Sequence, residues 1–355
     1  MKKIAFFTDS LGIGGIERAI INYLKMIDKT KYNITLFLEK KEGEYLNEVP
    51  KDIKVIYYNI CENKNVFLRK VINAFKLLKL SILYYHSFDF AACFKSTIKS
   101  GAILSKRFSK NNAFWFHGNY WNNQEEANYF LERYQIKKYR KIVFVSNSLK
   151  EKYQKVYPDS KQKFYVINNP IDINDLIEKS KEKIDKVKPK KLLLNVGRHS
   201  EEEKHLTMLF DCVSKLIKEN YHFELWLLGS GPDTEMYKKM VRDLKIDNYV
   251  KFLGFSKNVY PYIKISDGVV LSSYHEGNPV VFLEAKALNK PVITTDVSDA
   301  KIELDGYGIV TKNNEKDFLN GLRSFLDDGY EIKKKFNIDD YNYDILNKLD
   351  KVIED

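Results

Sequence analysis

The stretch 272–287 (SSYHEGNPVVFLEAKA) combines two glutamates with the expected start of a helix. Glu276 follows an apolar run that predicts a strand, Pro279 suits the first position of a helix, and Glu284 lies within that helix. The amides at a helix start suit a phosphate, so carboxylates on either side would hold hydroxyl groups at the two ends of a diphosphate. The simpler interpretation is a capping glutamate followed by a glutamate at the edge of the core.

A pair of cations follows another predicted strand. The segment 196–198 (VGR) places Arg198 at the strand end, and Lys204 comes six residues later. Two cations at this place would neutralise a diphosphate whose negative charge grows as it leaves. In the competing interpretation, both cations pair with the three glutamates at 201–203.

Two glycine-rich turns and one histidine also follow predicted strands. The turns 228–232 (LGSGP) and 12–18 (GIGGIER) allow a ligand to approach the backbone closely. The second turn lacks the GxGxxG spacing and an acid placed for a dinucleotide ribose, which excludes a nicotinamide enzyme. His117 leaves a strand in the segment 115–118 (WFHG), where a lone histidine is more often structural than catalytic.

Other chemistries lack their motifs. The chain has no GxxxxGK[ST] phosphate loop, no HExxH and no GxSxG. It also has no Asp-x-Asp, so cations and a helix end, rather than a metal, would neutralise a nucleotide-sugar diphosphate. Three cysteines, far apart and in no CxxC pair, predict neither a disulfide framework nor a zinc site. We therefore expect a soluble protein of a reducing, cytoplasmic compartment, without metal or cofactor.

The elements that position these residues follow an α/β pattern, in which short apolar runs alternate with amphipathic stretches. The predicted strands are 3–7, 33–38, 54–58, 91–94, 113–116, 142–145, 164–167, 191–196, 223–228, 250–252, 268–271 and 291–294. The predicted helices are 16–27, 66–80, 125–137, 147–156, 204–218, 234–244, 280–288 and 315–326.

The 355 residues are enough for two domains, and a charged stretch at 172–190 with few large apolar residues predicts the crossing between them. We expect two doubly wound, Rossmann-like domains that face each other across a cleft. The first spans 1–168, the second spans 169–335, and a last helix at 336–355 packs back toward the first. Ligands of such sheets bind beyond the carboxyl ends of the strands.

Together these segments resemble family 4 of the retaining glycosyltransferases, which have the two-domain GT-B fold. The resemblance runs along nearly the whole chain and is carried by GIGGIERAI, FHG, VFVSNSLKEKY, VINNPID, VGR, LLGSGPD, VKFLGF and SSYHEGNPVVFLEA. The two glutamates in their strand, loop and helix setting are the specific part of it.

The resemblance implies a role for each site residue. Glu276 would contact the donor hexose, and Glu284 the ribose hydroxyls of the nucleotide. Arg198 and Lys204 would bind the diphosphate and stabilise it as the leaving group, and His117 would face the donor sugar from the N-terminal domain. The other donor-binding positions that the resemblance implies are Gly14, Gly15, Gly197, Gly229, Gly231, Phe255, Gly277, Asn278, Pro279 and Val280.

The family retains the anomeric configuration, and the resemblance implies a front-face mechanism in which the acceptor hydroxyl gives its proton to the departing phosphate. Two features depart from the family pattern. The gap between Arg198 and Lys204 is one residue longer than in the commonest version, and Asn278 stands where many members carry phenylalanine. Because of the second departure, the resemblance does not identify the donor sugar.

The net positive charge is concentrated in the first half of the chain. Residues 1–168 hold 30 basic and 15 acidic residues, whereas the remainder holds 29 and 33. A concentration of positive charge attracts a polyanion, a phosphorylated substrate or an anionic membrane. The alternative is that the organism's proteins are rich in lysine in general, and that these residues lie on ordinary solvated helices. Nucleic acid is not expected, because the aromatic residues fall mostly within predicted strands.

The segment 66–83 alternates apolar clusters with basic residues, as an interfacial helix would. Its basic residues are Arg69, Lys70, Lys76 and Lys79. Each cation near an anionic leaflet contributes about 1 kcal/mol. We expect peripheral attachment to the inner face of the cell membrane, where a polyprenyl-diphosphate-linked saccharide is extended. The alternative is an ordinary helix that faces the core of the sheet.

The expected activity is transfer of a hexose or N-acetylhexosamine from a UDP-sugar to a saccharide acceptor, in the synthesis of a surface glycan such as a capsule or exopolysaccharide. One alternative is a nucleotide-sugar epimerase or hydrolase on the same fold. The other is a glycan-binding subunit without catalysis.

Overall fold

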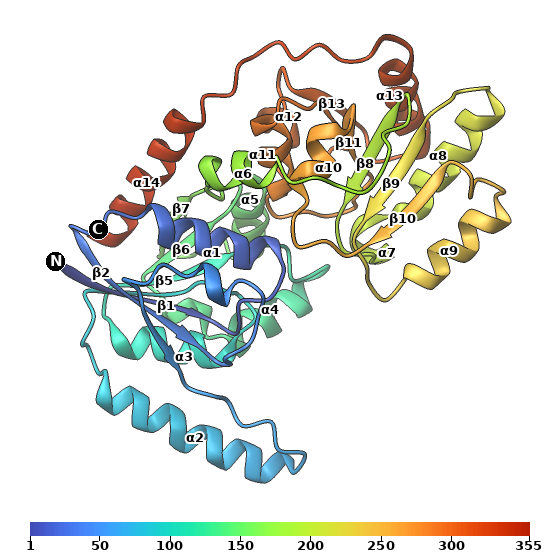
Figure 1. Ribbon diagram of the computed structural model, residues 1–355. Helices are drawn as coiled ribbons and strands as arrows, with labels where there is room; N and C mark the ends of the chain where they lie inside the picture. The colour runs from blue at the N-terminus through green and yellow to red at the C-terminus, as the bar shows by residue number, and fades with distance from the viewer. The chain divides into compact units, whose positions relative to one another are not determined.

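Strands and helices alternate along the chain, which divides into two compact units (Figure 1). The strands of each unit form one parallel sheet. The structure, a computed structural model, describes residues 1–355 except for the side chain of Asp328. Unit 1 comprises Met1–Pro170 and Asp339–Asp355, and unit 2 comprises Ile171–Ile338. The boundaries expected from the sequence, after residues 168 and 335, lie two and three residues before these positions.

Unit 1 contains a seven-stranded parallel sheet with the order β3-β2-β1-β4-β5-β6-β7. Its strands are β1 (Lys2–Thr8), β2 (Tyr32–Leu38), β3 (Lys54–Tyr57), β4 (Phe90–Cys93), β5 (Asn112–Phe116), β6 (Lys141–Phe144) and β7 (Lys163–Val166). Its helices are α1 (Gly15–Met26), α2 (Val66–Leu83), α3 (Lys99–Phe108), α4 (Gln124–Arg133), α5 (Asn147–Val156) and α14 (Ile338–Glu354), with short 3-10 turns at Leu46–Glu48 and Ile136–Lys138. The strand order reverses between β1 and β4.

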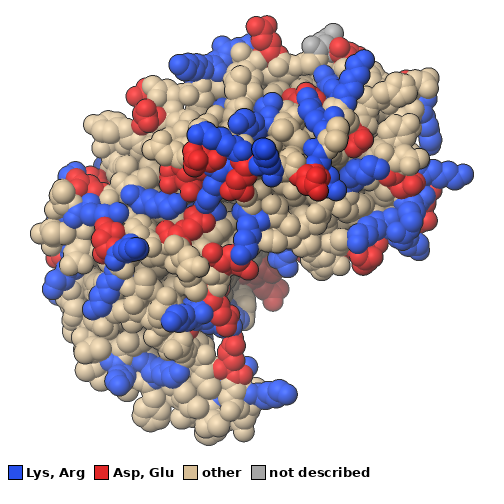
Figure 2. Space-filling model, in the orientation of Figure 1, with Lys and Arg blue, Asp and Glu red and all other residues tan. Residues whose placement is uncertain are grey.

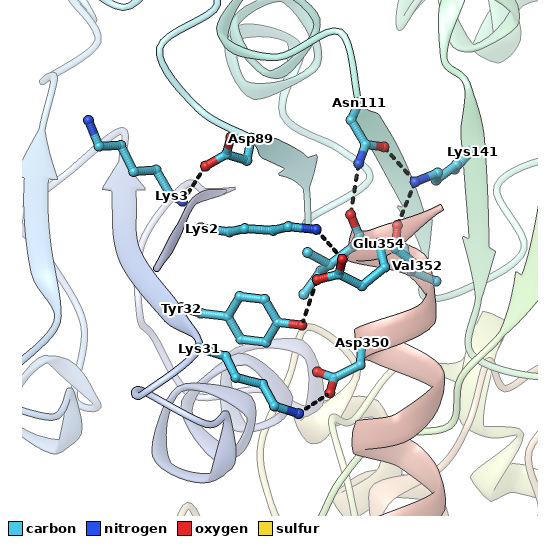
Figure 3. A network of polar contacts seen from close by, with 11 residues as sticks. Lys2, Lys3, Lys31, Tyr32, Asp89, Asn111, Lys141, Asp350, Val352 and Glu354 are labelled. Atoms are coloured by element: carbon cyan, nitrogen blue, oxygen red, sulfur yellow. Dashed lines mark hydrogen bonds and ion pairs between the residues drawn. The ribbon is translucent and has the colours of Figure 1, made fainter.

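Helix α14 joins unit 1 from the far end of the chain, through the polar network that Figure 3 shows. The buried Lys141 ammonium donates to the carbonyl of Val352 at 2.6 Å, and Asn111 Nδ2 donates to the carbonyl of Ile353 at 2.8 Å. Lys2 pairs with Glu354 on the same helix end. One ammonium and one side-chain amide thus satisfy two of the last carbonyls of the helix, where its dipole is negative.

Unit 2 contains a six-stranded parallel sheet with the order β10-β9-β8-β11-β12-β13. Its strands are β8 (Leu192–Val196), β9 (Glu224–Leu228), β10 (Val250–Gly254), β11 (Gly268–Leu271), β12 (Val292–Thr295) and β13 (Gly308–Thr311). Its helices are α6 (Ile173–Lys179), α7 (Glu201–Lys204), α8 (Leu206–Lys218), α9 (Thr234–Asp243), α10 (Tyr260–Ile265), α11 (Val280–Ala287), α12 (Ala300–Glu303) and α13 (Glu315–Asp328).

Both faces of the unit 2 sheet are covered, because alternate residues of its strands enter two separate apolar clusters. Leu193 packs with residues of α8, α9 and α13, whereas Leu192 and Leu194 pack with residues of α10, α11 and α12. A strand that is buried on both faces reads as a continuous apolar run, which is why β8 was recognisable in the sequence.

Several elements differ from the expected ones, and strand β13 and helices α10 and α12 were not predicted. The charged stretch 172–190 is not wholly a linker, because it contains α6, whose Asp172 caps the helix and whose Leu176 is buried. The single helix expected at 204–218 is two helices, since His205 has a φ of +47° between α7 and α8. Helix α3 was not predicted; it contains Gly101, a residue of low helix propensity, against which the Ile98 side chain packs closely.

Helix α2 lies along the outside of unit 1, and none of its residues is buried (Figure 1). One side of α2, which includes Leu77 and Leu80, packs against the core of unit 1, whereas Phe67 and Phe75 are exposed. Of the helices in the part of the chain that the structure describes, none has the length and hydropathy needed to cross a lipid bilayer.

Candidate active site

The predicted site residues of unit 2 lie where the strand order of its sheet reverses, between β8 and β11. The ladder between these strands contains Gly268 opposite Leu193 and Val269 opposite Leu194, and then stops. Beyond it, Asn195 Nδ2 donates to the carbonyl of Val270 at 2.8 Å. The strand ends therefore diverge slightly, and open α/β sheets bind ligands at such reversal points.

Glu276 and Lys204 meet at this point, although 72 residues separate them in the chain. The Lys204 ammonium lies 2.5 Å from Glu276 Oε1, and Ser273 Oγ donates to the same oxygen at 2.7 Å. Both charged side chains are mostly buried, with 19% of the lysine and 12% of the glutamate side chain exposed. A carboxylate held by two donors has a fixed orientation, which suits recognition of a substrate hydroxyl.

The loops that carry this pair are tied together by their backbones. The amide of Tyr274 donates to the carbonyl of Glu203, and Ser272 Oγ donates to the carbonyl of Lys204, both at 2.9 Å. The Tyr274 ring stacks on His205, with centroids 3.7 Å apart. Lys204, the last residue of α7, thus reaches the loop after β11 despite the longer gap that precedes it.

The interpretation in which Arg198 and Lys204 pair with the glutamates at 201–203 is wrong. Lys204 pairs with Glu276, and the exposed Arg198 makes no ion pair with any side chain that the structure describes. The Glu201 carboxylate instead accepts hydrogen bonds from the Thr207 hydroxyl and, at 3.0 Å, from Tyr237 OH. Arg198 is therefore available to an anion at the end of β8.

Helix α11 follows the loop that carries Glu276, and Glu284 lies within this helix. Helix α11 begins after Pro279, and no described side chain caps its first turn. The amides at Val280 and Val281 thus face an end of the helix where the dipole favours an anion. Glu284 is buried, with 8% of its surface exposed, one turn further along the helix.

Two glycines of the predicted site, Gly229 and Gly231, lie close to the backbone of a neighbouring loop. A Cβ on Gly229, where φ is +148°, would lie 1.9 Å from the carbonyl oxygen of Gly197, and one on Gly231 would lie 2.3 Å from that of His199. The loop after β9 therefore needs glycine because it packs on the loop after β8, whatever ligand lies nearby. Phe255, directly after β10, has 50% of its surface exposed.

In unit 1, His117 follows β5 and is 9% exposed. Burial lowers the pKa of its imidazole to about 3, so the ring is neutral at physiological pH. Its Nε2 atom has no hydrogen-bond partner among the residues that the structure describes. Gly14 and Gly15 lie at the start of α1, and a Cβ on Gly14 would lie 2.4 Å from the Glu17 carboxylate. The roles of these three residues toward a donor stay predictions.

Sequence patterns do not identify a polar cluster at the reversal point of the first sheet. The Lys95 ammonium, after β4, lies 2.9 Å from Asp9, after β1, and 2.6 Å from Glu17 on α1. Each residue follows a predicted strand or starts a predicted helix, but only the pairing of β1 with β4 brings them together. Within the described side chains, no group of three or more His, Cys, Asp or Glu residues is arranged to hold a metal ion.

Two family models match the chain one after the other. The model described as Glycosyltransferase Family 4 matches residues 13–175, and the model described as Glycosyl transferases group 1 matches residues 177–343. Among curated relatives, an N-acetylgalactosamine-N,N'-diacetylbacillosaminyl-diphospho-undecaprenol 4-alpha-N-acetylgalactosaminyltransferase of Campylobacter jejuni is 25% identical over 351 residues, which cover 92% of this chain and 91% of the relative.

Solved structures show the same fold over the full length. HepE of Anabaena, in complex with UDP and glucose, superposes with a TM-score of 0.73 at 17% identity and covers 99% of this chain and 100% of its own. TarM of S. aureus, in complex with fondaparinux, α-GlcNAc-glycerol and UDP, has a TM-score of 0.76 at 11% identity and covers 100% of both chains. With both family models matched in sequence order and both Rossmann-like units present, the chain belongs to the family 4 glycosyltransferases and has their GT-B fold.

Proposed function

We propose that the protein transfers a hexose or N-acetylhexosamine from a UDP-sugar to a saccharide acceptor, with retention of the anomeric configuration and without a metal or cofactor. The observation that carries this proposal is the Lys204–Glu276 pair beside the uncapped start of α11, at the reversal point of the second sheet. It offers a cation and free amides for a diphosphate, and a fixed carboxylate for a sugar hydroxyl.

In the proposed reaction, the bond from the anomeric carbon to the phosphate oxygen breaks, and a bond from that carbon to the acceptor oxygen forms on the same face. The acceptor hydroxyl passes its proton to the departing phosphate oxygen. Lys204, Arg198 and the α11 amides stabilise the charge that grows on the diphosphate, a role that accelerates the step because it strengthens toward the transition state. His117 serves as a neutral hydrogen-bonding group, since its pKa is far below physiological pH.

The nucleotide and acceptor in this proposal rest on the relatives. UDP is bound in the structures of HepE and TarM, and the Campylobacter enzyme is named for a saccharide on diphospho-undecaprenol. We propose a polyprenyl-diphosphate-linked saccharide as the acceptor here, in the synthesis of a surface glycan such as a capsule. Unit 1 would bind it, and unit 2 the donor.

A transfer assay tests the activity. We expect one UDP-sugar of a panel to raise the melting temperature, and its conversion to UDP to rise at least about tenfold when an undecaprenyl-diphosphate-linked saccharide is added. The product linkage should keep the donor's anomeric configuration by NMR, and EDTA should leave the rate unchanged. Equal turnover without acceptor would indicate a hydrolase or epimerase, and binding without turnover a non-catalytic subunit.

Helix α2 supports attachment to the inner face of the cell membrane. Besides Leu83 at its last position, four large apolar residues of α2 are more than half exposed: Phe67 at 77%, Phe75 at 69%, Leu78 at 57% and Ile82 at 70%. With 3.6 residues per turn they share one side of the helix, and Lys70 and Lys79 lie on its two flanks. Figure 2 shows mostly uncharged surface where α2 lies, with Lys and Arg beside it.

Vesicle flotation tests this attachment. The wild type should float with phosphatidylglycerol vesicles at low salt and less at high salt, because the cations are screened. Phe75→Asp should weaken binding by about tenfold or more, since a buried phenylalanine contributes about 1.5–3 kcal/mol. Val187→Asp, at an apolar residue of unit 2 that is 92% exposed, is the matched control and should float like the wild type. No flotation of the wild type at either salt would contradict the attachment.

A further inference from the structure

The turn that carries Glu276 is held in place by the end of β12 and the segment that follows it. Thr295 Oγ1 donates to the carbonyl of Ser273 at 2.7 Å, at one end of the loop. Ser298 Oγ donates to the carbonyl of Gly277, directly after Glu276. Ser298 itself has a φ of +51°, so the segment turns sharply to reach the loop. The loop after β11 thus depends on its neighbour in the sheet for its shape.

The third contact of this segment joins two side chains. Asn278 Nδ2 donates to Glu303 Oε1 at 2.6 Å, from the turn to the last residue of α12. Asn278 is 7% exposed, and the other carboxylate oxygen of Glu303 is out of contact with solvent. The Lys286 ammonium, on α11, donates to the backbone carbonyl of Glu303 at 3.1 Å. A buried carboxyl in this setting fixes its neighbours, because an unmatched polar group would be costly there.

We propose that Glu303 is a positioning residue that holds the Asn278 side chain and thereby the turn 276–278, so that it controls recognition of the donor sugar rather than of the nucleotide. The inference rests on the proposed function, in which Glu276 contacts the sugar and the α11 amides contact the diphosphate. In the family that the chain resembles, many members carry phenylalanine at the position of Asn278, and phenylalanine could not donate a hydrogen bond to Glu303.

Three variants separate this role from mere support of the fold. Glu303→Leu and Asn278→Ala each remove one partner of the hydrogen bond and should raise the KM for the UDP-sugar by about tenfold, since such a bond involves a charged group. The Kd for free UDP, measured by calorimetry, should stay within about twofold of the wild type. Glu303→Gln keeps an oxygen that accepts from Asn278 and should restore most of the sugar affinity. The double variant should lose no more than either single one.

The pH dependence gives a second readout. Burial raises the pKa of Glu303 to about 7, the Lys286 ammonium opposes this shift, and the Asp299 carboxylate adds to it. The carboxylate is the stronger acceptor, so the KM of the wild type should rise as the pH falls below about 7, up to the moderately higher KM of Glu303→Gln. In Glu303→Gln this dependence should be absent. Asp305→Asn, an acid-to-amide change at an exposed residue two positions further on, should behave like the wild type.

The outcomes distinguish a failure of the proposed function from a failure of the role of Glu303. A wild type that turns over no UDP-sugar contradicts the proposed function. A wild type that turns over its donor, while Asn278→Ala and Glu303→Leu keep the wild-type KM, contradicts only the role of Glu303. Equal losses for UDP and UDP-sugar would also overturn it, because they would indicate general support of the fold. If Glu303→Leu does not fold, Asn278→Ala and the pH profile of Glu303→Gln decide the question.

Discussion

Replacing Glu276 with alanine is expected to lower kcat by about 100- to 1000-fold, while the Kd for UDP stays within about threefold of the wild-type value. The carboxylate is held by Ser273 and Lys204 and is proposed to contact the donor sugar, so its loss removes an interaction that matters most in the transition state. The freed Lys204 ammonium no longer shares its charge with a carboxylate, so UDP should bind at least as well as before.

Steady-state kinetics with the donor found in the panel, together with calorimetry of UDP binding, measure this split. Glu202→Ala is the matched control, because Glu202 is an exposed glutamate on α7, close in sequence to the site. It should leave both values unchanged. Turnover of Glu276→Ala at the wild-type rate would contradict the assignment of Glu276, and a parallel loss of UDP affinity would place it at the nucleotide instead.

Replacing Lys204 with alanine should affect both steps. We expect a loss of about 100-fold in kcat and of about tenfold or more in the affinity for UDP, since the ammonium is proposed to bind the diphosphate before and during its departure. The Glu276 carboxylate, 12% exposed, would also lose its counter-charge. Its uncompensated negative charge would then repel the diphosphate.

The same two measurements test this variant, with melting temperature as a check that it folds. Lys264→Ala, at an exposed lysine on α10, is the control for loss of a positive charge and should behave like the wild type. Unchanged UDP affinity in Lys204→Ala would show that Arg198 and the start of α11 suffice for the diphosphate. Unchanged turnover would contradict the site itself.

Much of the fold could be predicted, because each central strand is buried on both faces and stands out as an apolar run. The runs 268–271 and 291–294 match β11 and β12 to within one residue at each end. Elements whose sequence carries other constraints were harder to predict. Helix α3 contains a glycine, which has a low helix propensity, and the helix at 204–218 is interrupted by the left-handed conformation of His205.

The candidate site was predictable in its parts. Glu276 before Pro279, and Lys204 soon after Arg198, are recognisable because a strand end, a loop and a helix start lie within about ten residues of one another. The partners of these residues were not predictable. Glu303 is 25 residues from Asn278, and nothing in either local pattern indicates that their side chains meet.

The sequence alone determined which residues stand at strand ends and helix starts, and hence which chemistry each loop carries, since those features depend on local hydrophobic periodicity and capping. Only the tertiary structure decided which loops meet. The order of strands in the sheet places β11 beside β8, so that Lys204 pairs with Glu276 instead of the glutamates next to it. Strand order follows from burial of whole faces of the sheet, a property of the folded chain that no single segment encodes.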